Sequence, residues 1–191
     1  MNQDPTYLSL TPREGAPPYP LLVLAHGRGA DEHDLVGISR VLDPRFYVIS
    51  VRAPLPFLSG YAWYRNVQAG APDPDDLRQG VELLQTLVEE LRVAGTADAT
   101  RLFALGFSQG AAMVGALLLT GAVSLRGAVM LSGFLPVDSG LTTPAGALAG
   151  RHVFVGHGEV DELIPVEFGD DARDMLVDGG ALVTHRRYPF G

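Results

Sequence analysis

"LFALGFSQGAAM" (residues 102–113) decides the fold of this 191-residue chain, because it has the pattern of a strand, a sharp turn and a helix. The apolar run before Gly106 suits a strand buried on both faces of a sheet, and the small residues after Gly110 let a helix approach that sheet. Ser108 lies between them in a G-x-S-x-G pattern. Side chains at the two glycine positions would collide with neighbouring backbone. This context favours a strained nucleophilic serine with an exposed hydroxyl over an incidental serine in a glycine-rich turn.

Strand-like and helix-like segments alternate along the rest of the chain, which predicts an α/β fold with a mostly parallel sheet. The strand candidates are residues 21–25, 47–51, 102–105, 128–131, 152–155 and 181–188, and residues 7–10 alternate as in an antiparallel edge strand. Further helices are expected over 31–44 (with Asp31 as N-cap), 73–95 and 165–180. The longest irregular stretch is 132–150, and no linker divides the chain. We therefore expect a single domain over residues 1–191.

Composition excludes several classes of chemistry and partner. The chain has no cysteine, and all 14 basic residues are arginine, so neither thiolate chemistry nor a lysine Schiff base is available. A net charge of −8 argues against nucleic acid as a partner. No apolar run reaches membrane-spanning length, and residues 1–10 lack the basic and apolar regions of a signal peptide. We expect a cytoplasmic protein with no membrane span.

A second glycine-rich turn follows the strand candidate 21–25, in "LLVLAHGRGADEHDL" (21–35). Acyl transfer develops an oxyanion that needs N–H donors, and a turn after an early strand supplies one of them in the G-x-S-x-G fold. We expect the Arg28 N–H to be that donor and the Gln109 N–H to be the other. His26 precedes the glycines, so we expect it to bond loop backbone. His26, Asp31 and His33 have no recognised metal-ligand spacing, and we expect no metal.

A third glycine-rich turn, in "HVFVGHGEVDELIP" (152–165), carries Asp161 beyond a strand candidate. The acid of a catalytic triad lies on such a loop at the carboxyl end of a strand, so Asp161 is our candidate. Glu159 and Glu162 are expected at the solvated surface. We expect His157, within the turn, to form structural hydrogen bonds rather than to act as the base.

Four motifs together resemble one family. "HGRGADEHDL", "GFSQGAAM", "LSGFLP" (131–136) and "GHGEVDELIP", in this order, are similar to the phospholipase/carboxylesterase family of α/β-hydrolases. This family includes acyl-protein thioesterases and small bacterial carboxylesterases. The resemblance implies an α/β-hydrolase fold with helices on both faces of the sheet and no large cap domain. It also implies a Ser–Asp–His triad with Ser108 as nucleophile and Asp161 as acid.

The same resemblance assigns oxyanion roles to Arg28 and Gln109 and places Trp63 at an aromatic position near the family's active site. Trp63 could line the acyl pocket, and ordinary loop packing is the alternative. An arginine at position 28 is unusual where the family leads us to expect an apolar residue. Its side chain could favour an anionic or polar substrate, or could pair with Asp31 or Glu32.

The triad order Ser, Asp, His calls for a histidine just after the last core strand. The chain has only His185 beyond Asp161, and His185 falls inside the strand candidate 181–188. We therefore expect the catalytic histidine directly after Gly191, outside this chain, so that the domain lacks its C-terminal segment. His185 acting as the base is the remaining alternative.

These observations predict a serine carboxylesterase that needs no cofactor and acts on a small-molecule ester. An acyl-protein thioesterase or lysophospholipase would use the same machinery on a thioester or a different leaving group. A non-catalytic binding protein on a hydrolase scaffold is the alternative from another class. The family resemblance also makes a homodimer plausible.

Overall fold

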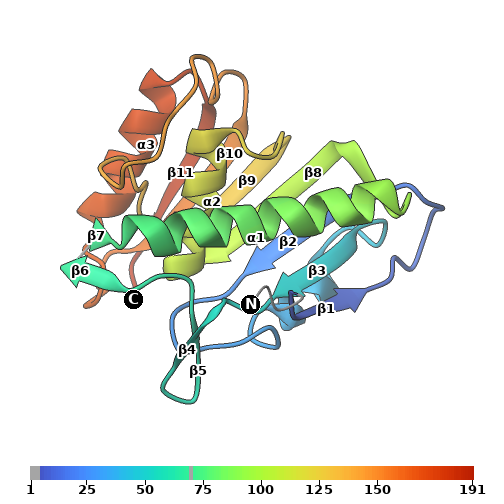
Figure 1. The fold of residues 1–191 in the computed structure, drawn as a ribbon. Helices are drawn as coiled ribbons and strands as arrows, with labels where there is room; N and C mark the ends of the chain where they lie inside the picture. Colours follow the sequence, from blue (N-terminus) through green and yellow to red (C-terminus); the bar gives the residue numbers. More distant parts are fainter. Residues whose placement is uncertain (1–4, 69–70) are drawn as a thin grey trace.

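A seven-stranded sheet forms the centre of the protein in the computed structural model, which describes residues 5–68 and 71–191 (Figure 1). The strand order is β1-β3-β2-β8-β9-β10-β11. Only β1 runs antiparallel, against β3, and the other pairs are parallel. The mostly parallel sheet and its antiparallel edge are thus confirmed. The strands are β1 (Tyr7–Leu10), β2 (Tyr19–Ala25), β3 (Tyr47–Val51), β8 (Ala97–Phe107), β9 (Gly127–Leu131), β10 (His152–Gly158) and β11 (Leu182–Tyr188).

Three α-helices pack on one face of this sheet (Figure 1): α1 (Pro74–Val93), α2 (Gln109–Thr120) and α3 (Glu167–Asp178). All three contribute side chains to one apolar cluster with alternate residues of the strands. Asp73 caps α1 by accepting the N–H groups of Asp75 and Asp76, which satisfies two donors at the helix end. Helix α2 is buried along almost its whole length, and this burial fixes the turn that precedes it.

Among the described residues, the one helix on the opposite face is the short 3-10 helix η1 (Val36–Val41), where a helix over 31–44 was predicted. That prediction was wrong for residues 31–35 and 42–44, and in the first turn the polar side chains bond elsewhere. Asp31 Oδ1 accepts the His33 N–H at 2.9 Å, which closes a local turn, and the Glu32 carboxylate is bound by Arg52. Apolar residues of this segment cover a second cluster formed by Leu22, Leu24, Val48 and Leu105.

Two small hairpins between β3 and α1 were not predicted. They are β4 (Leu55–Phe57) with β5 (Gly60–Ala62), and β6 (Asn66–Gln68) with β7 (Ala71–Pro72). The first hairpin packs on the loop after β2, where Gly29 N–H donates to the Tyr61 carbonyl and Tyr61 N–H to the Ala30 carbonyl. These strands are too short to show an alternating pattern in the sequence.

The long segment 132–150 contains no helix or strand, as predicted. Residues 1–4, which belong to the N-terminal stretch that lacks signal-peptide features, lie outside the described residues. Within the described ranges, no helix is at once long and apolar enough to cross a membrane.

Candidate active site

Ser108 lies at the turn between β8 and α2 in a conformation that L-residues rarely adopt, with φ 53° and ψ −117°. The glycines on either side permit this turn. A Cβ at Gly106 would overlap the Gly110 carbonyl, and a Cβ at Gly110 would overlap the Ala25 carbonyl at the end of β2. The predicted collisions at both glycine positions are therefore confirmed.

Gln109, the first residue of α2, uses its side chain for structural hydrogen bonds and leaves its backbone N–H unengaged among the described residues. Gln109 Oε1 accepts the Trp63 N–H at 3.0 Å, and Gln109 Nε2 donates to the Tyr64 carbonyl at 2.8 Å. The Gln109 backbone N–H has no acceptor among the described residues. A free N–H at a helix N-terminus next to Ser108 is a donor that an oxyanion can use.

The loop after β2 lies beside the serine. A Cβ at Gly27 would lie 3.5 Å from Ser108 Cβ, and the Arg28 N–H finds no acceptor in the described part of the chain. The Gly27 carbonyl accepts a hydrogen bond from His26 Nδ1 at 2.7 Å. Because the C=O and N–H of one trans peptide point in opposite directions, this bond also fixes the direction of the Arg28 N–H.

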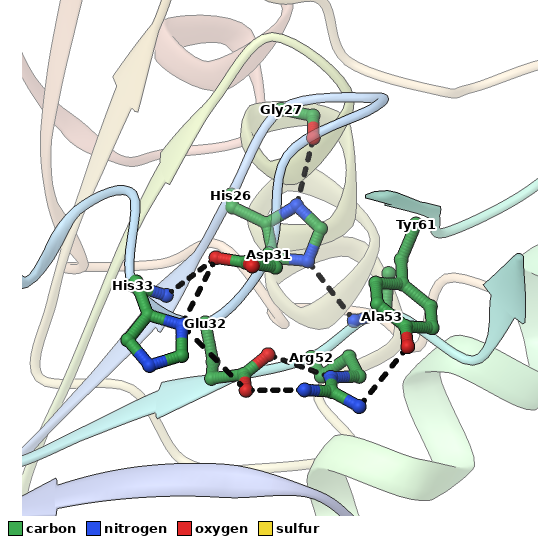
Figure 2. A network of polar contacts seen from close by, with 8 residues as sticks. All are labelled: His26, Gly27, Asp31, Glu32, His33, Arg52, Ala53 and Tyr61. Carbon is green, nitrogen blue, oxygen red and sulfur yellow. Dashed lines mark hydrogen bonds and ion pairs between the residues drawn. The ribbon is translucent and has the colours of Figure 1, made fainter. Parts of the chain in front are cut away.

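His26 is buried and bonds only to backbone, which is the structural role predicted for it (Figure 2). Its Nε2 accepts the Ala53 N–H at 3.1 Å, so Nδ1 carries the proton that goes to Gly27. Burial lowers the pKa of His26, and the neutral ring is the form that can accept from Ala53. Trp63 Nε1–H donates to the His26 carbonyl at 2.9 Å, which completes the support of this loop.

An ion pair with a buried carboxylate and a partly exposed guanidinium supports the same loop (Figure 2). Arg52 donates to both oxygens of Glu32, at 2.6 and 2.5 Å, and to the Tyr61 hydroxyl at 3.0 Å. These side-chain hydrogen bonds lower the pKa of Glu32. Asp31, Glu32 and His33 form a group of potential metal ligands within the described residues, but Arg52 already neutralises its one buried carboxylate.

Asp161 lies opposite, on the loop after β10. Its Oδ1 accepts the N–H groups of Leu163 and Ile164, both at 2.9 Å, and Oδ2 lies 3.7 Å from His157 Nε2. The same His157 Nε2 lies 2.8 Å from the Ile164 carbonyl and donates to it. His157 therefore ties down the acid loop, as predicted, and its proton is already engaged.

One cavity of about 780 Å³ brings Ser108, Asp161 and Arg28 together. Its apolar lining includes Phe107, Val160, Leu163 and Phe190. Trp63 does not line this cavity: its side chain is fully buried in the core, which is the packing alternative considered for it. The Gln109 side chain is likewise buried, so only its backbone is available to the site.

Two residues at this end of the sheet, His185 and Gly191, bear on the position of the catalytic base. His185 lies in β11 with Nε2 3.6 Å from Asp170 Oδ1, and it is not among the residues that line the cavity. Burial, and then the charge of Arg173, lower its pKa. Gly191, by contrast, lines the cavity, and a Cβ there would lie 2.5 Å from the Val160 oxygen and 3.1 Å from the Asp161 nitrogen.

Sequence reasoning missed the contacts that hold the two loops. Glu32 and Arg52 lie 20 residues apart, and no pattern connects them. The local turn at Asp161 was detectable, since an aspartate that precedes an apolar pair and a proline is a common turn-forming arrangement.

Comparison with known proteins adds independent information. A sequence profile of the phospholipase/carboxylesterase family matches residues 11–190. The putative hydrolase MhqD of Bacillus subtilis (strain 168) is 29% identical over 161 residues, which cover 84% of this chain and 79% of MhqD. The Bacillus cereus carboxylesterase superposes with a TM-score of 0.85 at 25% identity, over 97% of this chain and 85% of that one. The Mesorhizobium loti carboxylesterase gives 0.80 at 26% identity, over 90% and 80%.

Proposed function

The chain belongs to the phospholipase/carboxylesterase family of hydrolases, and from that premise we propose that it is a serine carboxylesterase with Ser108 as nucleophile and Asp161 as triad acid. The observation that carries the proposal is the pair of backbone N–H groups at Arg28 and Gln109, which find no acceptor in residues 5–68 and 71–191, beside a strained serine in a cavity.

Ser108 Oγ attacks the ester carbonyl carbon, and a histidine takes its proton and gives it to the leaving alcohol. The carbonyl oxygen becomes an oxyanion that accepts from the Arg28 and Gln109 N–H groups. Both groups are held in place before substrate binds, which supports a role in transition-state stabilisation. Water then attacks the acyl-enzyme, the same histidine again moves the proton, and the carboxylic acid leaves.

We propose that the base comes from the position that continues from Gly191. Gly191 packs on Val160 and Asp161, so a side chain at the next position would begin beside the proposed acid and in the wall of the cavity that holds Ser108. His157 and His185 are poorer candidates, because His157 donates to Ile164 and His185 lies against Asp170.

Replacement of Ser108 tests the nucleophile. Ser108→Ala should lower ester hydrolysis by roughly 10⁴-fold or more and abolish labelling by a fluorophosphonate probe. Ser59→Ala, at an exposed serine in the β4–β5 turn, is the matched control and should retain both. Ester hydrolysis that survives Ser108→Ala would refute the proposal, and an acyl-thioester assayed in parallel would define the leaving-group preference.

The position of the base can be tested with a chain that ends at Gly191 and two single-residue extensions of it. Appending one histidine should raise kcat by about 100-fold or more, whereas appending one glutamine should not. A chain that ends at Gly191 and hydrolyses esters as fast as the histidine-extended form, but loses this activity in His185→Gln, would assign the role to His185 instead.

A further inference from the structure

Arg28 adds a positive charge to the residues that line the cavity containing Ser108. It lines that cavity, its side chain is exposed, and it makes no ion pair with the described residues. The partners considered for it from the sequence are engaged elsewhere: Asp31 bonds His33, and Glu32 bonds Arg52. Among the described residues, the guanidinium therefore has no carboxylate that neutralises it.

Phe57 packs against this guanidinium. Arg28 Cζ lies 5.1 Å from the centroid of the Phe57 ring, in a cation–π contact. Phe57 belongs to the β4–β5 hairpin, which is joined to the Arg28 loop by the Gly29 N–H bond to the Tyr61 carbonyl at 2.7 Å. A guanidinium that packs over a ring can keep its edge free, and the edge is the part that binds a carboxylate through two parallel hydrogen bonds.

Arg28 differs in charge from the other residues that line the cavity. Of the described residues that line it, Arg28 alone carries a permanent positive charge, while Asp161 and Glu162 carry carboxylates on the opposite side. The whole chain has a net charge of −8, so its overall field repels anions. An anionic substrate group would therefore be favoured at Arg28 and disfavoured at the acid loop, which orients the substrate as well as selecting it.

We propose that Arg28 recognises a carboxylate on the substrate, so that the enzyme prefers short esters that carry a negative charge near the scissile bond. This inference rests on the proposed function, because the Arg28 backbone N–H is the proposed oxyanion donor. The guanidinium is then never further from the reacting carbonyl than the length of one arginine side chain. Arg28 would serve two purposes, with its backbone in catalysis and its side chain in specificity.

The size of the effect depends on how much water the substrate displaces. A fully exposed ion pair contributes little, whereas a planar two-point pair partly covered by Phe57 and substrate contributes more. We expect roughly tenfold in kcat/KM, the preference that about 1.4 kcal/mol provides.

The test measures a ratio of kcat/KM values on matched substrates by pH-stat or NMR. Monoethyl glutarate and ethyl pentanoate share a five-carbon acyl chain and differ in the terminal carboxylate. 4-Acetoxybenzoate and methyl 4-acetoxybenzoate place the same difference in the leaving group. In Arg28→Met, the charged-to-neutral ratio should fall about tenfold for at least one pair, and that pair identifies the side of the ester that carries the charge.

Two further variants separate stacking from charge. Arg28→Lys keeps the charge but loses the planar stack and the two-point geometry, so the ratio should lie between those of wild type and Arg28→Met. Arg126→Met removes an exposed arginine before β9, outside the cavity, and should leave the ratio unchanged. Added NaCl should also reduce the wild-type ratio, whereas a purely structural role of Arg28 would not respond to salt in this way.

The outcomes are distinguishable from failure of the proposed function. If neither neutral ester is hydrolysed by a Ser108-dependent route, the proposed function fails. If the neutral esters are hydrolysed but both charged-to-neutral ratios stay the same in Arg28→Met, the enzyme is an esterase and the carboxylate inference is overturned.

Discussion

The two walls of the cavity are built by different physical means. The nucleophile wall, formed by Gly27–Arg28 and Phe107–Gly110, is held by backbone packed so closely that side chains cannot be added at key points. The acid wall, Gly158–Ile164, is held by hydrogen bonds to one carboxylate and one histidine and exposes Val160 and Leu163 to solvent. Steric exclusion at the turn therefore fixes the group that attacks, with His26 and Trp63 supporting the loop beside it. Hydrogen bonds orient the group that assists, on a loop where Gly158 also leaves no room for a side chain.

The largest effect is expected where the acid wall depends on a single carboxylate. Asp161→Asn in the active enzyme should lower kcat by about 10⁴-fold, because an amide holds the histidine in the wrong tautomer. The control is Glu162→Gln, which removes the neighbouring charge and should leave kcat nearly unchanged. Both variants are measured by steady-state ester hydrolysis. A similar loss in both would mean that the negative charge of the loop supports catalysis and that Asp161 has no specific role as the acid.

A substitution in the nucleophile wall should lower the stability of the folded protein. Gly110→Ala forces a Cβ against the Ala25 carbonyl and should lower the free energy of unfolding by about 3 kcal/mol, or the melting temperature by roughly 10 °C. Gly37→Ala, where a Cβ meets no atom within 4 Å, is the control and should melt close to wild type. Equal melting temperatures of the two variants would show that the turn at Ser108 accommodates an added Cβ more easily than its geometry indicates.

The partly buried Glu32–Arg52 ion pair beside the nucleophile wall should give a smaller loss. Glu32→Gln leaves the Arg52 guanidinium without its counter-charge and should lower the melting temperature by about 4 °C. Glu89→Gln breaks an ion pair of similar geometry, with Arg92, at the exposed surface of α1, and we expect no measurable change. Thermal unfolding followed by circular dichroism compares them, and equal shifts would contradict a special role for the partly buried pair.

The smallest effect is a dependence of stability on pH. Burial holds the pKa of His26 below its ordinary value of 6.5 in the folded protein, so the unfolded chain binds more protons as the pH falls below 6.5. The free energy of unfolding should therefore decrease from pH 7 toward pH 5, and His26→Gln should reduce that slope. His185→Gln should reduce it less, since His185 is less buried and lies outside the nucleophile wall. Urea unfolding at pH 7.5, 6.0 and 5.0 measures both slopes, and a steeper change in His185→Gln would reverse this ranking.

The features of the molecule that could be predicted from the sequence are those set by local patterns. The sharp turn at Ser108, the glycines beside it and the mostly parallel direction of the core strands were all predicted, because each depends on a local rule about strands, helices and glycine. The elements α1 and α3 were also predicted, although α3 begins at Glu167 rather than at Pro165.

Apart from the two short hairpins and the local turn at Asp31, the features that could not be predicted depend on contacts between residues distant in the sequence. The helix expected over 31–44 gave way to turns because Glu32 binds Arg52, and Trp63 entered the core because its indole bonds the His26 carbonyl. The fate of the Arg28 side chain was open for the same reason. Its possible partners Asp31 and Glu32 are neighbours in the sequence, and only the fold shows that other residues occupy them.

The positive φ of Ser108 has a consequence that is stereochemical. At φ 53° and ψ −117°, the mirror-image conformation lies in the extended region, so a D-residue would be relaxed where this L-serine is strained. Glycine, which has no handedness, would also be relaxed, and strain of this kind costs on the order of 1–3 kcal/mol. The backbone of the proposed nucleophile thus adopts a conformation that suits a D-residue better than an L-residue. A search for stabilising substitutions that ignores chemistry would replace this residue among the first.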